Sequence, residues 1–105
     1  MKTDREIKRV ILRAHEEAEL TMINTRSSNT APGWCYVTVR PADTPECKIL
    51  LREARGRKGP RGGVILDVKI SNRLADNYAY ADKLARILHD ELGLRTTVTR
   101  ERRLD

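Results

Sequence analysis

The residues best suited to bind a charged ligand form a cationic cluster in the middle of the chain. Four glycines and a proline fall within residues 54–63, and this composition predicts a long, mobile hairpin tip. Cations on such a tip neutralise phosphates and release counterions, so the segment predicts a nucleic-acid contact. The alternative is a solvated loop whose charges aid solubility. The cations of the cluster are Arg52, Arg55, Arg57, Lys58 and Arg61.

The tip also carries a short motif. Residues 55–63 read RGRKGPRGG, which resembles the AT-hook, a short Arg-Gly-Arg-Pro element that lies in the minor groove of DNA. Lys58 follows Arg57 where the AT-hook has proline. The likeness is one of composition, and we do not assign the chain to that family.

A second candidate surface follows from strand alternation. Successive side chains of a strand point to opposite faces, so each strand divides its residues between the core and an open face. Aromatic and cationic side chains on one face could stack a base and bind phosphate. The alternative is an ordinary amphipathic sheet with one wet face. The residues expected on the open face are Tyr36, Arg40, Lys48, Arg52 and Lys69.

Two acidic segments suggest metal-dependent chemistry. Residues 45–46 read Pro-Glu and residues 67–69 read Asp-Val-Lys, and together they resemble the PD-(D/E)xK signature of metal-dependent nucleases. The resemblance implies that Glu46 and Asp67 hold Mg²⁺ and that Lys69 positions the attacking water. It implies help from an acidic residue of the first helix, either Glu6 or Glu17. The alternative is that Asp67 and Lys69 are simply neighbours on an exposed strand face, and we predict no catalytic residue, metal or other cofactor.

The remaining reactive and aromatic residues favour structural roles. His15 and His89 each lie on a predicted helix without a metal-binding spacing, so both are expected to be ordinary surface residues. Cys35 and Cys47 are expected to be buried free thiols, with a disulfide between neighbouring strands as the alternative. Trp34 is expected to close one edge of the core, or else to contact a partner.

The hydrophobic pattern predicts the elements that must position these residues. Thr3 and Glu6 match a capping box, so a helix should begin there and run to about residue 22. Apolar residues at alternating spacings of four and three predict a second helix from Leu74 to Leu92, which Gly93 should end. Strands are predicted over residues 35–40, 47–53, 64–70 and 95–101.

The predicted elements define a fold class. Their order is α-β-β-β-α-β, and each helix has a single apolar face. We therefore expect one α+β domain over residues 1–105, with two layers: a mostly antiparallel sheet of about four strands and two helices on one of its faces. An unpaired edge strand of such a sheet could support a homodimer.

Composition limits the functional classes. The net charge is +6, and residues 35–70 hold eight Lys/Arg against four Asp/Glu, so the excess is concentrated in the middle of the chain. The segment MKTDREIKRV lacks the apolar stretch of a signal peptide and no run approaches a membrane helix, so a cytoplasmic location without membrane contact is expected.

The sequence therefore favours a non-enzymatic binding module for nucleic acid, either DNA or RNA, or for a nucleoprotein complex. The first alternative is a protein-interaction module, such as a phage- or plasmid-type accessory protein or inhibitor of a nucleoprotein machine. The second alternative is the magnesium-dependent nuclease.

Overall fold

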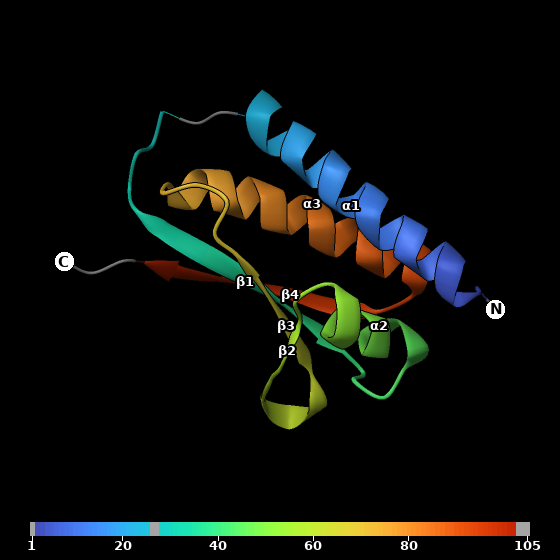
Figure 1. The fold of residues 1–105 in the computed structure, drawn as a ribbon. Coiled ribbons are helices and arrows are strands. Elements are labelled where there is room, and N and C mark those ends of the chain that lie inside the picture. Colours follow the sequence, from blue (N-terminus) through green and yellow to red (C-terminus); the bar gives the residue numbers. More distant parts are fainter. Residues whose placement is uncertain (1, 26–27, 103–105) are drawn as a thin grey trace.

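A computed structural model of the chain describes residues 2–25 and 28–102. Figure 1 shows the arrangement of its helices and strands. In chain order they are α1 (Asp4–Asn24), β1 (Gly33–Arg40), α2 (Pro45–Glu53), β2 (Arg57–Lys58), the 3₁₀ turn η1 (Pro60–Gly62), β3 (Val64–Val68), α3 (Leu74–Leu92) and β4 (Arg95–Arg102).

The strands form one antiparallel sheet in the order β2-β3-β1-β4. Helix α3 lies directly against β1 and β4, and α1 packs on α3 on the same side of the sheet (Figure 1). The predicted α+β class, the four strands and the placement of the two long helices on one face are confirmed. What differs is a third α-helix, α2, in the first half of the chain.

The prediction of a strand over residues 47–53 is wrong, because this segment forms α2. Thr44 caps the helix by accepting a hydrogen bond at Oγ1 from the backbone N–H of Cys47 at 3.2 Å. Pro45 occupies the first turn, where its missing N–H costs no hydrogen bond. Cys47 and Leu50, three residues apart, are both fully buried, although strand alternation predicts Leu50 on the outer face.

The fourth strand instead comes from the predicted hairpin tip. Arg57 and Lys58 form β2 and pair with β3. Part of the segment that composition predicts as a long loop is therefore a strand, and the tip is shorter than predicted. A Cβ atom on Gly56 would lie 2.8 Å from Cγ1 of Val64, and one on Gly59 would lie 2.8 Å from Cγ1 of Ile65. These two glycines therefore permit close packing of β2 on β3, whereas the sequence predicts that they keep the loop mobile.

The predicted ends of the long helices are confirmed. The backbone N–H of Glu6 donates to Thr3 Oγ1 at 3.2 Å, and Glu6 Oε1 accepts from the backbone N–H of Thr3 at 3.1 Å, which completes the capping box. Gly93 ends α3 in the left-handed conformation, with φ of 66°, and Leu94 then turns into the core. These ends fix where α3 stops and where β4 begins.

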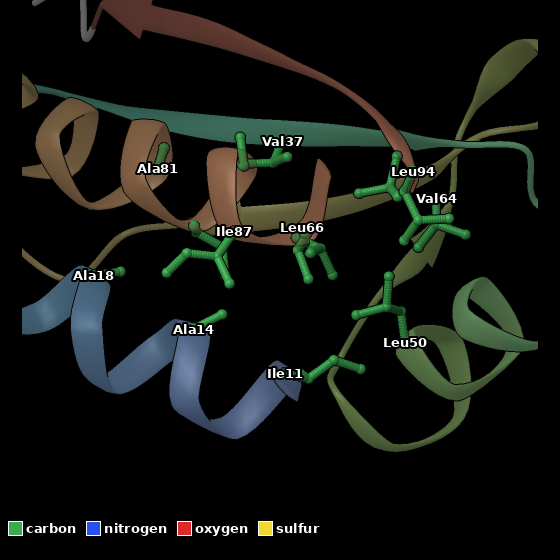
Figure 2. Packing of buried hydrophobic residues seen from close by; sticks show 14 of the residues in the cluster. Ile11, Ala14, Ala18, Val37, Leu50, Val64, Leu66, Ala81, Ile87 and Leu94 are labelled. Atoms are coloured by element: carbon green, nitrogen blue, oxygen red, sulfur yellow. The ribbon is translucent and has the colours of Figure 1, made fainter. Parts of the chain in front are cut away.

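The core is built from aliphatic side chains of the sheet and of all three α-helices (Figure 2). Cys35 and Cys47 are buried free thiols, as predicted. Burial raises the pKa of the Cys35 thiol to about 11, so it stays protonated at neutral pH. None of the helices in the described ranges is both long and apolar enough to cross a membrane.

Candidate nucleic-acid interface

The sheet face opposite the helices, here called the open face, gathers cationic, aromatic and hydroxyl side chains. In β1, Cys35, Val37 and Val39 point to the core, so the residues between them point to the open face. The antiparallel register places Arg95, Thr97, Thr99 and Glu101 of β4 opposite these outward residues. The outward residues of β1 are Trp34, Tyr36, Thr38 and Arg40.

A hollow of about 600 Å³ lies on the open face. Two of its lining residues, Thr38 and Ile65, are directly opposite each other in β1 and β3 and are nearly inaccessible to solvent. Tyr36 and three arginines also line it, so it combines an aromatic side chain with positive charge. The lining residues are Tyr36, Thr38, Arg40, Arg57, Arg61, Ile65, Thr97 and Thr99.

Arg57 is held on the open face by Asp67. Its Nε donates to Oδ2 of Asp67 at 2.9 Å and its Nη2 donates to Oδ1 at 3.2 Å. This hydrogen-bonded pair holds the pKa of the Asp67 carboxyl below its ordinary value and raises that of the guanidinium. A guanidinium has five N–H donors and this pair uses two of them, so Arg57 is oriented while it keeps donors for an additional acceptor.

The strand ends beside the hollow concentrate positive charge. Arg40 and Arg95 are directly opposite each other in the β1–β4 ladder, an arrangement that is unfavourable between like charges. Arg61 reaches the same hollow from the 3₁₀ turn, where its backbone has a φ of 62°. A bound anion between these side chains would relieve their repulsion, so the cluster suits a phosphate.

Trp34 and Lys69 form a second cationic and aromatic pair on this face. The ammonium of Lys69 lies 4.8 Å from the centre of the Trp34 ring, within the range of a cation–π contact. The expectation that Trp34 closes an edge of the core is wrong, because its position in β1 points it away from the helices. A smaller hollow of about 290 Å³ adjoins the pair, next to Ser71 and Asn72.

A buried asparagine on α3 ties down the chain around this pair. Asn77 is completely inaccessible to solvent, and its Oδ1 accepts from the backbone N–H groups of Ile70 and Ser71 at 2.9 and 3.0 Å. Its Nδ2 donates to the carbonyls of Gly33 and Ser71, both at 2.8 Å. The side chain thus joins the start of β1 to the segment after β3, where Trp34 and Lys69 lie.

The structure places only some of the predicted binding cations together. Arg40, Arg57, Arg61 and Lys69 share the open face. The predicted placement of Lys48 and Arg52 on that face is wrong, because both are exposed side chains of helix α2.

Two further cations of the cluster also point elsewhere. Lys58 is opposite the core residue Val64, so it lies on the helix side of the sheet. Arg55 lies beside a groove of about 490 Å³ between α1 and α2, here called the α1–α2 groove. The cluster is therefore divided between surfaces and does not form a single cationic finger.

Sequence reasoning missed the contribution of β4. Arg95, Thr97 and Thr99 lie on the open face, and two of them line the large hollow. The signal was present, because Val98 is the single apolar residue of this strand. Placing Val98 toward the helices predicts that Arg95, Thr97 and Thr99 point the other way.

The acidic residues of the nuclease resemblance lie on different kinds of element. Glu46 is in the first turn of α2, and Asp67 is on β3 with its carboxylate engaged by Arg57. Residues 2–25 and 28–102 contain no group of three or more His, Cys, Asp or Glu side chains that could hold a metal ion.

The two histidines differ in their surroundings. His89 is exposed, as predicted, and its Nδ1 is 3.0 Å from Oδ1 of Asp90. The surface prediction for His15 is wrong, because it is half-buried beside the α1–α2 groove. Its Nδ1 is 2.5 Å from the hydroxyl of Tyr80, and burial lowers the pKa of the imidazole.

Comparison with protein-family models, with curated proteins and with solved structures gives no significant match for this chain.

Proposed function

We propose that the protein binds nucleic acid through the open face and acts as a binding module without catalysis. The observation that carries this proposal is the convergence of Arg40, Arg57 and Arg61 around one hollow that also presents the ring of Tyr36. Cations that neutralise phosphates and aromatic rings that stack on bases are the two contributions that hold single-stranded nucleic acid.

Single-stranded nucleic acid suits this surface better than a duplex. Tyr36 and Trp34 are two residues apart on one strand, so their Cα atoms are about 7 Å apart and both side chains point to the open face. Unpaired bases can stack on such rings, whereas bases in a duplex are already stacked on one another. Arg40 and Arg61 lie beside Tyr36, where the phosphates of a strand crossing the sheet would pass.

The proposal is tested by removing open-face charge without touching the ion pair of Arg57. The variant carries Arg40→Gln, Arg61→Asn and Lys69→Gln, with asparagine at residue 61 because it tolerates a positive φ. Binding to labelled single strands of about 16 nucleotides, DNA and RNA, is measured by fluorescence anisotropy. We expect affinity at low salt to fall by roughly tenfold or more, because three phosphate contacts are lost.

The chain provides a matched control that loses the same charge from other surfaces. It carries Lys48→Gln, Arg52→Gln and Lys58→Gln, and none of these residues lies on the open face. We expect its affinity to stay within about threefold of the wild type, which is the effect of net charge alone. Equal losses in the two variants would contradict the proposal, because binding would then follow total charge and not the open face.

One observation favours the alternative of a protein-interaction module. Helix α1 exposes Leu12, Leu20 and Ile23, each with more than half of its surface accessible, and Leu12 adjoins the α1–α2 groove. Exposed apolar residues that cluster on one surface often mark a protein contact. A pulldown from host lysate with and without nuclease separates the two functions: captured protein that survives nuclease treatment and is lost with Leu20→Glu would favour this alternative.

A further inference from the structure

The outer edge of β4 is long and regular. Its eight residues pair with β1 without interruption from Arg95 to Arg102, and it contains neither a proline nor a bulge. In the sheet as far as the structure describes it, β4 is a terminal strand and no further strand pairs with its outer side. Natural edge strands are normally blunted by such devices, because their free N–H and C=O groups can pair with another chain.

The side chains of β4 are complementary to those of a second, antiparallel copy. In a two-fold symmetric pair centred on Val98, Arg95 of one copy lies opposite Glu101 of the other, and this contact occurs twice. The same register places Thr97 of one copy opposite Thr99 of the other, and Val98 of one copy opposite Val98 of the other. Opposite charges and paired threonines are both favourable across strands, and no other centre on β4 brings Arg95 opposite Glu101.

The register also preserves the two faces of the sheet. Residues 95, 97, 99 and 101 point to the open face, and each would be opposite another residue of that set. On the helix side, a hollow of about 360 Å³ runs between α3 and β4 and is lined by Val98, Ala85, Asp82 and Arg86. Asp82 and Arg86 form an ion pair at 3.1 Å. The surface beside β4 therefore carries both a positive and a negative charge, which is compatible with the same surface of a second copy related by two-fold symmetry.

We propose that the protein forms a symmetric homodimer through antiparallel pairing of β4 with β4 of a second copy, centred on Val98. The two sheets then join into one, and the two open faces lie side by side on the same surface of the dimer. This inference rests on the edge of β4 alone and holds whether or not the open face binds nucleic acid.

A charge swap tests the register. Arg95→Glu and Glu101→Arg each place like charges opposite each other twice in the dimer, whereas the double variant restores two opposite-charge contacts. Sedimentation equilibrium of the full chain should show a dissociation constant raised roughly tenfold in each single variant and returned near the wild-type value in the double variant. Loss of dimer in the double variant as well would overturn the register.

Cysteine crosslinking tests the centre of symmetry. Val98→Cys brings two thiols directly opposite each other, where the Cα atoms of paired residues are about 4.5–5.5 Å apart and a disulfide can form. Thr97→Cys is the matched control, because residue 97 would face residue 99 of the other copy and not itself. The native cysteines are fully buried. We expect a disulfide-linked dimer from Val98→Cys alone; crosslinking in both variants or in neither would contradict the proposal.

A further variant separates this edge from the apolar surface of α1. Leu20→Glu introduces charge on that surface, far in sequence from β4, and should leave the dimer unchanged. A wild-type chain that remains monomeric at about 100 μM, which corresponds to an association free energy weaker than about −5.5 kcal/mol, would overturn the proposal. A dimer abolished by Leu20→Glu and insensitive to the charge swap would assign self-association to α1 and overturn it too.

Discussion

The guanidinium of Arg57 and the carboxylate of Asp67 form a two-point hydrogen-bonded pair across β2 and β3, with distances of 2.9 and 3.2 Å. The pair anchors the short strand β2 to the edge of the sheet and aligns Arg57 with the large hollow. It also occupies both oxygens of the carboxylate that the nuclease resemblance assigns to magnesium. The two interpretations of Asp67 therefore make opposite predictions.

Replacing Asp67 by asparagine should leave nucleic-acid binding at least as tight as in the wild type. The change removes a negative charge from the open face while keeping one acceptor oxygen for Arg57. Because Asp67 and Arg57 form an exposed ion pair, the free energy of unfolding should fall by no more than about 1 kcal/mol. Anisotropy titrations and denaturant unfolding measure the two quantities.

The same variant tests the nuclease alternative. Labelled single- and double-stranded substrates are incubated with the wild type and with Asp67→Asn in the presence and absence of Mg²⁺. We expect no cleavage by either protein. Magnesium-dependent cleavage by the wild type that disappears in the variant would make Asp67 a catalytic ligand and replace our proposed function.

His15 predicts a dependence of stability on pH. Burial lowers the pKa of its imidazole below the ordinary 6.5, so the unfolded chain takes up a proton more readily than the folded one. Stability from this residue is complete above pH 6.5 and is lost as the pH falls toward the lowered value. The free energy of unfolding, measured by denaturant titration between about pH 7.5 and 5, should therefore decrease on acidification.

Matched histidine variants check the source of that decrease. His15→Gln should flatten the dependence, because the buried titratable group is removed. His89→Gln is the matched control, because it removes an exposed histidine that does not line the α1–α2 groove. Lys8, Glu53 and Arg55 line the same groove as His15 and are present in both variants, so they cannot account for a difference between them. Identical pH profiles in the two variants would contradict the assignment.

Hydrophobic patterns that continue along a whole helix or strand made the main elements predictable. The apolar stripe of α3 continues without a break from Leu74 to Leu92, and Asp67, the one polar residue of β3, indicates that its neighbours Leu66 and Val68 point to the core. Helix α2 is different, because the run Ile49-Leu50-Leu51 is equally compatible with a buried strand. The decisive signal was the Thr-Pro pair at residues 44–45, which is a helix start and not only a turn.

The candidate site was less predictable than the fold, for a physical reason. Alternation within a continuous strand placed Tyr36 and Arg40 correctly on the open face. Arg57 and Arg61 reach the same face only because β2 pairs with β3 and the 3₁₀ turn follows, and composition does not encode that pairing. A Gly-rich cationic segment has the same composition whether it is a free finger or, as here, a short strand packed on its neighbour.

Asn77 is expected to be the most sensitive polar residue. Its amide makes four hydrogen bonds to backbone groups of Gly33, Ile70 and Ser71. Asn77→Asp replaces the donating Nδ2 by an oxygen that faces the carbonyls of Gly33 and Ser71. Denaturant unfolding should show a loss of roughly 3 kcal/mol or more, since each unsatisfied buried group costs about 1–3 kcal/mol.

Ser71→Ala provides the comparison for Asn77. It removes a hydroxyl that donates to Asp76 at 2.9 Å and accepts from the backbone N–H of Arg73, but it leaves the amide bonds of Asn77 intact. Its cost should be near 1 kcal/mol, the contribution of an ordinary hydrogen bond at a half-buried site. Similar costs for the two variants would mean that Asn77 does not organise the segment between β3 and α3.

Arg40 and Tyr36 line the same hollow but should contribute to binding in physically different ways. A phosphate contact releases counterions, so its contribution to the affinity depends on salt concentration. Base stacking on an aromatic ring releases no counterion and depends little on salt. Measuring affinity across a salt series therefore distinguishes the two residues even if both substitutions weaken binding at one salt concentration.

For single-stranded nucleic acid, Arg40→Gln should reduce the slope of log affinity against log salt by about 0.7, the value for one phosphate contact. Tyr36→Leu should lower the affinity by about 1–3 kcal/mol per stacked base and leave the slope unchanged. Tyr36→Phe keeps the ring and should bind nearly as well as the wild type. A slope that falls with Tyr36→Leu, or an affinity that Tyr36→Phe and Tyr36→Leu reduce equally, would show that Tyr36 does not stack on a base. The open face would then hold phosphates alone, and its preference for single strands would lose its physical basis.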